Sequence, residues 1–121
     1  MLADRDHLLE LEKNFWTGDR SFYEQHVDAD CLVVFSSEMA GVMSRSDLAA
    51  TAGEGNRWKD LEIALKGIIE PVDGIVIMTY EARAVRDSGE PHAALVSTGY
   101  ARRGDGWRMI FHQQTTLPAA T

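Results

Sequence analysis

The sequence predicts an α+β fold, in which helices near the N-terminus pack on one face of an antiparallel sheet. Two observations predict it. Apolar residues recur at helical spacing near the N-terminus, whereas from Trp58 onward they alternate with polar residues at a period of two. The chain has 121 residues, of which 45% are hydrophobic and 26% charged, and this is enough for one domain with its own core. We therefore expect a single domain over residues 1–121.

Helical spacing is clearest at the start of the chain. The apolar residues that recur there on one helical face are Leu8, Leu11, Phe15 and Trp16. Gly18 can end this helix. Ser21 and Glu24 then have the spacing of a capping box, which predicts a short second helix through about His26.

Strands and one further helix are predicted along the rest of the chain. A buried strand over 31–35 precedes a short strand over 41–43. Ser44 or Ser46 can cap a short helix over 47–52. The remaining segments are a loop over 53–56 and a meander of four strands, one from Trp58 and the others over 75–86, 92–102 and 107–115.

Composition excludes several classes of protein. Twelve Lys and Arg against nineteen Asp and Glu give a formal net charge of −7, and the basic residues are scattered, so we expect no nucleic-acid partner. The single cysteine, Cys31, allows no intrachain disulfide and reads as a small buried hydrophobic residue. No apolar run approaches the about 20 residues of a membrane helix, and the N-terminus lacks the pattern of a signal peptide. We expect a cytoplasmic protein with no membrane contact.

Both faces of the predicted meander carry apolar residues. On the strand over 75–86, one face holds Ile75, Ile77 and Val85 and the other holds Val76, Met78 and Tyr80. An antiparallel sheet with one solvated face alternates more cleanly than this. Because the helices can cover only one face, we predict a homodimer whose partner subunit covers the other. The alternative is a few exposed apolar residues on a monomer.

The common catalytic and metal-binding motifs are absent. There is no phosphate-binding glycine loop, no pair of histidines with metal spacing on a helix, and no serine-nucleophile motif. The four histidines fall in four different predicted elements. We therefore predict neither a metal site nor a cofactor.

Polar residues on strands that should be buried mark the candidate site. We predict a cavity floored by the sheet and roofed by the first helix, with these side chains pointing into it: Glu81, Thr98, Tyr100, His112 and Gln114. In the alternative interpretation Glu81 is solvated beside Arg83, and His112 is a structural histidine.

Histidine suits proton transfer, because its pKa lies near neutrality, so His112 is the candidate catalytic residue. Glu81 would orient the imidazole or act as the base itself. Thr98, Tyr100 and Gln114 would donate hydrogen bonds to a carbonyl or carboxylate of the ligand. Two aromatic side chains, Phe35 and Trp16, complete the predicted ligand-binding residues.

The order of elements and three segments point to a known family. These segments are TYEAR at 79–83, RRGDGWR at 102–108 and FHQQT at 111–115. With them the chain resembles the nuclear transport factor 2-like superfamily, a cone-shaped α+β roll with a curved sheet, and within it the SnoaL-like branch, domain of unknown function 4440. The resemblance implies a homodimer through the convex sheet face and a hydrophobic pocket on the concave side.

Relatives in that superfamily include ketosteroid isomerases, polyketide cyclases, dehydratases and non-catalytic association domains. The isomerase tyrosine, general base and protonated aspartate would fall near Leu11, near Ser36 or Ser37, and near Thr98, where the residue types differ. The pocket arginines of the kinase association domains would fall near Glu81, Thr98 and Gln114, and they are absent too.

Two functions follow as hypotheses. The first is a domain that binds a small organic molecule in a polar-lined hydrophobic pocket, with cofactor-independent lyase or isomerase chemistry by His112 and Glu81. The second is a non-catalytic dimerisation, association or ligand-sensing module. Contact between His112 and Glu81 inside a cavity would favour the first.

Overall fold

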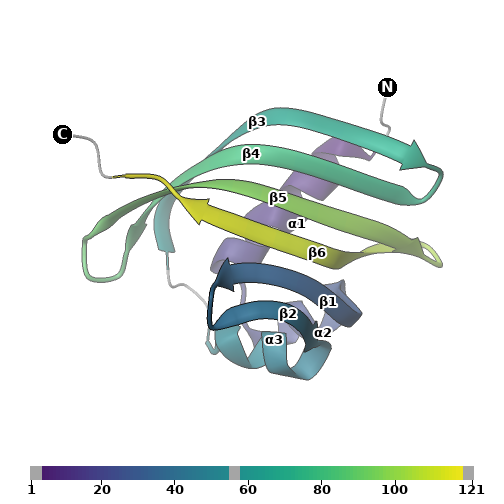
Figure 1. Cartoon of the computed structure of the whole chain (residues 1–121), viewed down its shortest axis with the longest axis horizontal. Helices are drawn as coiled ribbons and strands as arrows, with labels where there is room; N and C mark the ends of the chain where they lie inside the picture. Colours follow the sequence, from purple (N-terminus) through teal and green to yellow (C-terminus); the bar gives the residue numbers. More distant parts are fainter. Residues whose placement is uncertain (1–3, 55–57, 119–121) are drawn as a thin grey trace.

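Three helices cover one face of a six-stranded sheet in the computed structural model of the chain (Figure 1). The structure describes residues 4–54 and 58–118. The strands are ordered β2-β1-β6-β5-β4-β3. Neighbouring strands are antiparallel except for β1 and β6, which run parallel. The predicted α+β fold is confirmed.

The helices begin and end close to the predicted positions. They are α1 (Arg5–Thr17), α2 (Arg20–His26) and α3 (Arg45–Ala52). Ser44 caps α3, as one of the two predicted alternatives, and its hydroxyl accepts a hydrogen bond from the Asp47 N–H at 3.2 Å. The predicted capping box at Ser21 is wrong, because Asp19 caps α2 by accepting from the Phe22 N–H at 3.0 Å.

The strands extend the predicted ones at most ends. They are β1 (Val27–Ser36), β2 (Met39–Ser44), β3 (Trp58–Val72), β4 (Ile75–Arg86), β5 (Pro91–Arg103) and β6 (Gly106–Thr116). Strands β3 to β6 form the predicted meander, in which β4 has the predicted bounds. Of the predicted loop over 53–56, residues 55 and 56 lie outside the described residues, and Gly53 follows α3 with a φ of 57°.

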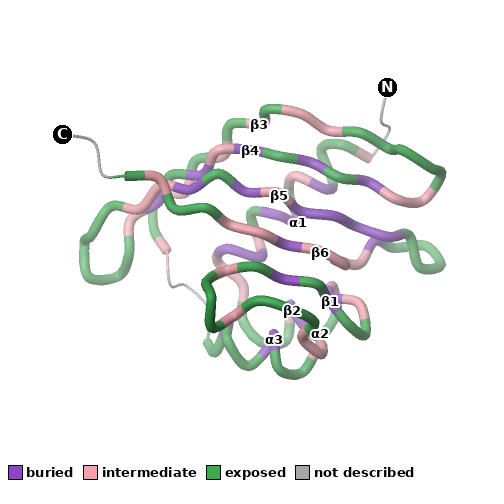
Figure 2. The backbone as a smooth tube through the Cα atoms, viewed as in Figure 1, coloured by how far each residue is buried: buried purple, intermediate pink, exposed green. Residues whose placement is uncertain are grey.

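The core lies between α1 and the inner, concave face of the sheet. Along β4 every second residue from Val76 to Ala84 is buried, and Figure 2 shows this alternation along the strand. The predicted apolar face of α1 packs against these residues, since Leu8, Leu11, Phe15 and Trp16 are all buried. Register shifts in the β3–β4 and β5–β6 pairings mark local irregularities in the ladders.

The outer, convex face of the sheet carries the exposed large apolar residues of the described chain. They are Leu32, Val34, Val42, Ile69, Val72, Ile77 and Leu95. The strand register places all of them on one side: for example, Leu32 pairs with Val42, and Ile77 pairs with Ile69, on the face away from buried Val76. Apolar residues therefore occupy both faces of the sheet, as predicted.

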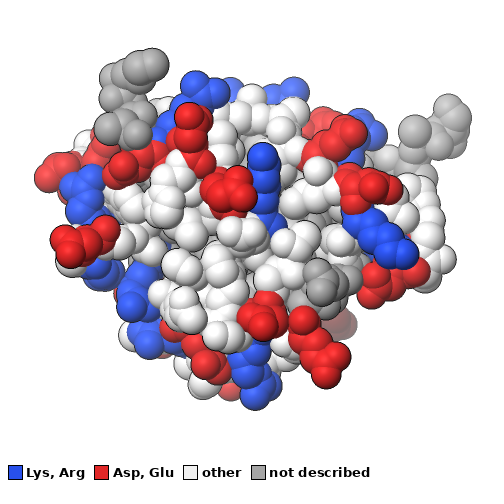
Figure 3. Space-filling view, turned by 180° about the vertical axis from the view of Figure 1, so that it is seen from behind, with Lys and Arg blue, Asp and Glu red and all other residues white. Residues whose placement is uncertain are grey.

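The helix-covered side of the molecule shows interspersed charges. Figure 3 shows acidic and basic side chains next to one another over this side, without a continuous area of one sign. Within the described residues, no helix combines the length and the apolar character that crossing a membrane requires.

Candidate functional site

A cavity of about 420 Å³ opens between the helices and the concave face of the sheet. It is lined by Phe15, Trp16, Tyr23, Phe35, Met39, Leu48, Thr51, Trp58, Arg86, Met109, His112 and Gln114. Most of these side chains are aromatic or aliphatic, and His112 and Gln114 together form a polar group in the wall contributed by β6. This is the composition typical of a site for a small organic molecule.

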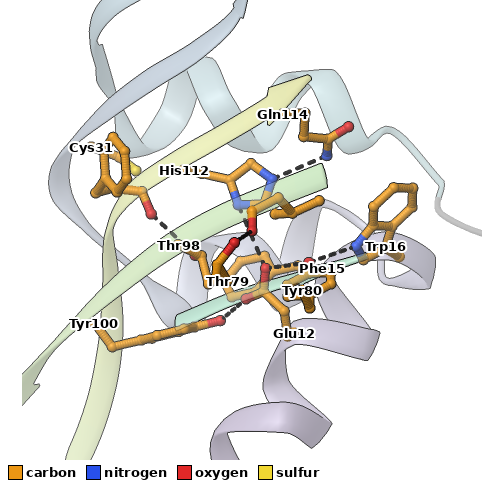
Figure 4. A network of polar contacts seen from close by, with 12 residues as sticks. Glu12, Phe15, Trp16, Cys31, Thr79, Tyr80, Thr98, Tyr100, His112 and Gln114 are labelled. Atoms are coloured by element: carbon orange, nitrogen blue, oxygen red, sulfur yellow. Dashed lines mark hydrogen bonds and ion pairs between the residues drawn. The ribbon is translucent and has the colours of Figure 1, made fainter. Parts of the chain in front are cut away.

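A buried carboxyl group, Glu12 of α1, lies behind that polar group. Its side chain is completely buried and stands between two tyrosines of the sheet (Figure 4). The Tyr80 hydroxyl donates to Glu12 Oε1 at 2.6 Å, and the Tyr100 hydroxyl donates to Oε2. The indole N–H of Trp16 in turn donates to the Tyr80 oxygen at 2.9 Å. The carboxyl group thus accepts hydrogen bonds at both oxygens in a fully buried position.

Burial and hydrogen bonding act on the pKa of Glu12 in opposite directions. Removal from water raises it, and the hydrogen bonds from Tyr100 and Tyr80 lower it, which leaves a pKa of about 7. Burial and the adjacent Glu12 raise the pKa values of both tyrosines well above the usual value. The tyrosines therefore stay protonated donors, while Glu12 changes its charge near neutral pH.

His112 lies between Glu12 and the cavity. Its Nδ1 is 3.5 Å from Glu12 Oε1, which is longer than an ordinary hydrogen bond, and Nδ1 has no closer partner in the described chain. Its Nε2 is 3.0 Å from the amide nitrogen of Gln114. With the Gln114 amide nitrogen turned toward the ring, Nε2 is the acceptor, and the ring proton is assigned to Nδ1, facing Glu12.

Burial also keeps the His112 imidazole neutral. It lowers the pKa of His112 to about 4, because the charged ring would lose its hydration. The ring centroid of Phe35 lies 5.5 Å away on the cavity side. The arrangement therefore presents a neutral imidazole to the cavity, with its Nε2 lone pair next to Gln114 and a titratable carboxyl group behind it.

The structure brings together four of the predicted site residues at the cavity wall: Trp16, Phe35, His112 and Gln114. Thr98 and Tyr100 are buried on the same face of the sheet but do not line the cavity. Thr98 donates to the Phe111 carbonyl at 3.1 Å, and Tyr100 donates to Glu12. These two residues shape the environment of the carboxyl group.

The predicted position of Glu81 is wrong. Glu81 alternates with buried Tyr80 and Ala82, so its side chain projects from the convex face, where it is 24% exposed and pairs with Arg83 at 2.8 Å. It therefore cannot orient His112, which lies on the concave side. The carboxyl group that faces the imidazole is that of Glu12, from a different element.

Sequence reasoning missed Glu12 and Tyr80 of the polar network, and it also missed eight of the twelve residues that line the cavity. The signal for Glu12 was its position: it falls four residues after Leu8 and four before Trp16, on the apolar face of α1. A carboxylate on the core-facing side of an amphipathic helix needs a buried partner. Within the described residues, no group of three or more metal-ligating side chains is arranged to hold a metal ion.

Comparison with known proteins defines the fold. No family model matches the chain, and no curated protein matches it. Among solved structures, a nuclear transport factor 2-like protein of unknown function from Prochlorococcus has a TM-score of 0.73 at 12% identity, over 98% of this chain and 97% of its own. A ketosteroid isomerase-like protein from Erwinia carotovora has a TM-score of 0.73 at 12% identity, over 95% and 94%.

The CaMKII association domain of C. elegans is a third similar structure, with a TM-score of 0.64 at 12% identity, over 94% of this chain and 96% of that domain. These similarities show that the chain has the nuclear transport factor 2-like fold, a cone-shaped α+β roll. The proteins with this fold include both isomerase-like and association domains.

Proposed function

We propose that the chain binds a small, mainly apolar organic molecule in the cavity between the helices and the sheet. The observation that carries this proposal is that the cavity wall combines a large aromatic surface with a localised polar contact. Aromatic side chains such as Phe15, Trp16 and Trp58 supply the apolar surface, and His112 with Gln114 supplies a localised polar contact. A ligand that carries one hydrogen-bond donor would place it at the Nε2 atom of His112 in exchange for the Gln114 amide, because the single Nε2 lone pair accepts one hydrogen bond.

Proton transfer is the chemistry that this arrangement supports. His112 would accept a proton from the ligand at Nε2, and the imidazolium so formed would be stabilised by an ionised Glu12 facing Nδ1. The lyase or isomerase reaction that we propose therefore needs Glu12 ionised, a condition met above its pKa of about 7. In this role Glu12 replaces Glu81 as the positioning residue for His112.

The three segments at 79–83, 102–108 and 111–115 support placing the chain in the SnoaL-like branch as a part of this proposal. His112 and Gln114 belong to the last of these segments, and both line the cavity. The branch assignment does not specify a reaction, so the binding experiment is designed on the chemistry of the cavity.

Binding of two matched bicyclic probes tests the proposed function. 2-Naphthol carries a hydroxyl donor, whereas 2-methylnaphthalene has the same shape without one. We expect 2-naphthol to bind about tenfold more tightly, because an unmatched polar group in the cavity costs about 1–3 kcal/mol. His112→Phe should remove this preference, and isothermal titration calorimetry measures all four dissociation constants.

A second variant separates loss of the cavity from loss of the polar contact. Met39→Trp enlarges a half-buried side chain that lines the cavity, and we expect it to weaken the binding of both probes equally. If the folded wild-type chain binds neither probe at millimolar concentration, the binding proposal is wrong.

The convex face supports a second candidate function, that of an association module. Seven large apolar side chains are exposed there, and we propose that a second copy of the chain covers them in a two-fold dimer. A copy of the same chain is the simplest occupant, because a two-fold axis brings identical apolar faces together. The two functions are compatible, since the cavity opens on the opposite side of the sheet.

Sedimentation equilibrium tests the dimer. We expect the wild-type chain to be dimeric at micromolar concentration and the double variant Ile77→Asp, Leu95→Asp to be monomeric, because buried unpaired charges oppose association. Ala50→Asp adds one charge of the same sign on the exposed side of α3 and should leave the dimer intact. A wild-type chain that remains monomeric at about 100 μM, well above the Kd expected of a stable interface, would contradict the proposal.

A further inference from the structure

The cavity wall contains one cationic side chain among the described lining residues, Arg86 at the end of β4. Its position follows from strand alternation. Even-numbered residues of β4 from Val76 to Ala84 face the concave side, and Arg86 continues that series. The residue is exposed, so its charge lies at the mouth of the cavity, where a ligand enters from water.

The guanidinium of Arg86 is held against an aromatic ring and has no acidic partner among the residues that the structure describes. Its central carbon lies 4.7 Å from the centroid of the Trp58 ring, so one face of the group is stacked. Stacking leaves the in-plane N–H donors free, and no carboxylate of the described chain lies within ion-pair distance of them.

Three other arginines of the sheet have acidic partners. Arg83 pairs with Glu81, Arg102 with Asp73, and Arg103 with Asp28. Arg86 therefore combines three properties that these arginines lack together: it lines the cavity, an aromatic ring stacks on its guanidinium, and its side-chain donors have no partner among the described residues. Such a planar donor set matches the two oxygens of a carboxylate.

The sheet register places Arg86 away from the polar group of His112 and Gln114. Tyr80 pairs with Val96, which pairs with Gln114, so these residues lie at one level of the sheet. Arg86 lies six residues farther along β4 than Tyr80, and a strand rises by about 3.3 Å per residue. The cavity thus has a hydrogen-bond acceptor toward one end and a cation toward the other, with aromatic walls between them.

We propose that the ligand class of this cavity is an elongated aromatic monocarboxylate with a hydroxyl or similar donor at the end opposite the carboxylate. This inference rests on the proposed binding function and names the ligand chemistry. The carboxylate pairs with Arg86, the apolar body lies against the aromatic walls, and the far donor meets His112 Nε2. One guanidinium matches one negative charge, which favours a carboxylate over a doubly charged phosphate.

A longer scaffold with a donor at one end and a carboxylate at the other tests this class. The probe is 4′-hydroxybiphenyl-4-carboxylate, and its neutral match is 4′-hydroxybiphenyl-4-carboxamide. In the wild-type chain we expect the carboxylate to bind about tenfold more tightly than the amide, the effect of one charge-assisted contact. Arg86→Gln should make the two affinities equal, because it should weaken the binding of the carboxylate and leave the binding of the amide unchanged. Arg83→Gln is the matched control, because it removes the same charge from the opposite face of β4 and should preserve the difference.

The outcomes separate this inference from the function on which it rests. If the wild-type chain binds the acid and the amide with equal affinity, and the binding of the amide still depends on His112, the carboxylate class is wrong and the binding function stands. An acid preference that survives Arg86→Gln likewise overturns the role of Arg86. If neither compound binds, the proposed function fails and the ligand class fails with it.

Discussion

Replacing Glu12 by alanine is expected to lower the free energy of unfolding at pH 4.5, where Glu12 is protonated, by about 3–5 kcal/mol, the usual effect of removing one member of a buried polar pair. The substitution takes away the acceptor of two buried hydroxyl donors, Tyr80 and Tyr100. It also leaves a cavity under α1, and the two costs act together. Urea denaturation followed by circular dichroism measures the loss.

Two variants define what this result means. Glu12→Gln keeps the shape and one acceptor oxygen, so at the same pH of 4.5 we expect it to lose only about 1–2 kcal/mol. Glu10→Ala changes an exposed carboxylate on the same helix and should stay within about 0.5 kcal/mol of wild type. If Glu12→Ala were as stable as Glu10→Ala, the buried hydrogen-bond network would not support the fold.

The stability of the chain should respond to pH through Glu12 and His112 in opposite directions. The pKa of Glu12 rises from 4.5 to about 7 in the fold, so stability is greatest below pH 4.5. As the pH rises from 4.5 to 7, the unfolded chain releases a proton that the folded chain retains, and the free energy of unfolding falls. At 1.36 kcal/mol per pKa unit, this loss is about 3 kcal/mol.

His112 has the opposite effect. Its pKa falls from 6.5 to about 4 in the fold, so its contribution is complete above pH 6.5 and is lost as the pH falls toward 4. Between pH 4.5 and 6.5 the two contributions cancel, and the pair as a whole holds one proton. Replacing either residue should therefore reveal the pH dependence of stability that the other one causes.

Urea unfolding of the single variants at several pH values checks this cancellation. Glu12→Gln should gain about 3 kcal/mol of stability between pH 4 and 6.5, because only the His112 contribution remains. His112→Gln should lose a similar amount between pH 4.5 and 7. Two variants with the pH dependence of the wild-type chain would show that these groups are not buried together.

Much of the fold could be predicted from local patterns. Helical spacing located α1, and alternation with turn residues located β4 to within the observed bounds. The parallel pairing of β1 with β6 joins Val33 to His112, which are far apart in sequence, and no local periodicity encodes such a contact. The cap of α2 was missed because Asp19 and Ser21 are both good capping residues two positions apart.

The site could be predicted only in part, because the register of the strands decides which side chains meet. Alternation alone places Tyr80 and Glu81 on opposite faces but does not say which face the helix covers. Both faces of β4 carry apolar residues, so Glu81 was assigned to the wrong one. The true carboxyl partner came from α1, where Glu12 was overlooked within an apolar stripe.

The central claim is that a buried carboxyl group holds a neutral imidazole at the wall of a ligand cavity. Nitrogen-15 NMR of the His112 ring over pH 3.5 to 8 tests this most directly. We expect His112 to stay neutral down to about pH 4, with the proton on Nδ1 and its chemical shifts perturbed near pH 7 as Glu12 ionises. A ring that titrates near the free value of about 6.5, without a second step near pH 7, would contradict this account of the site.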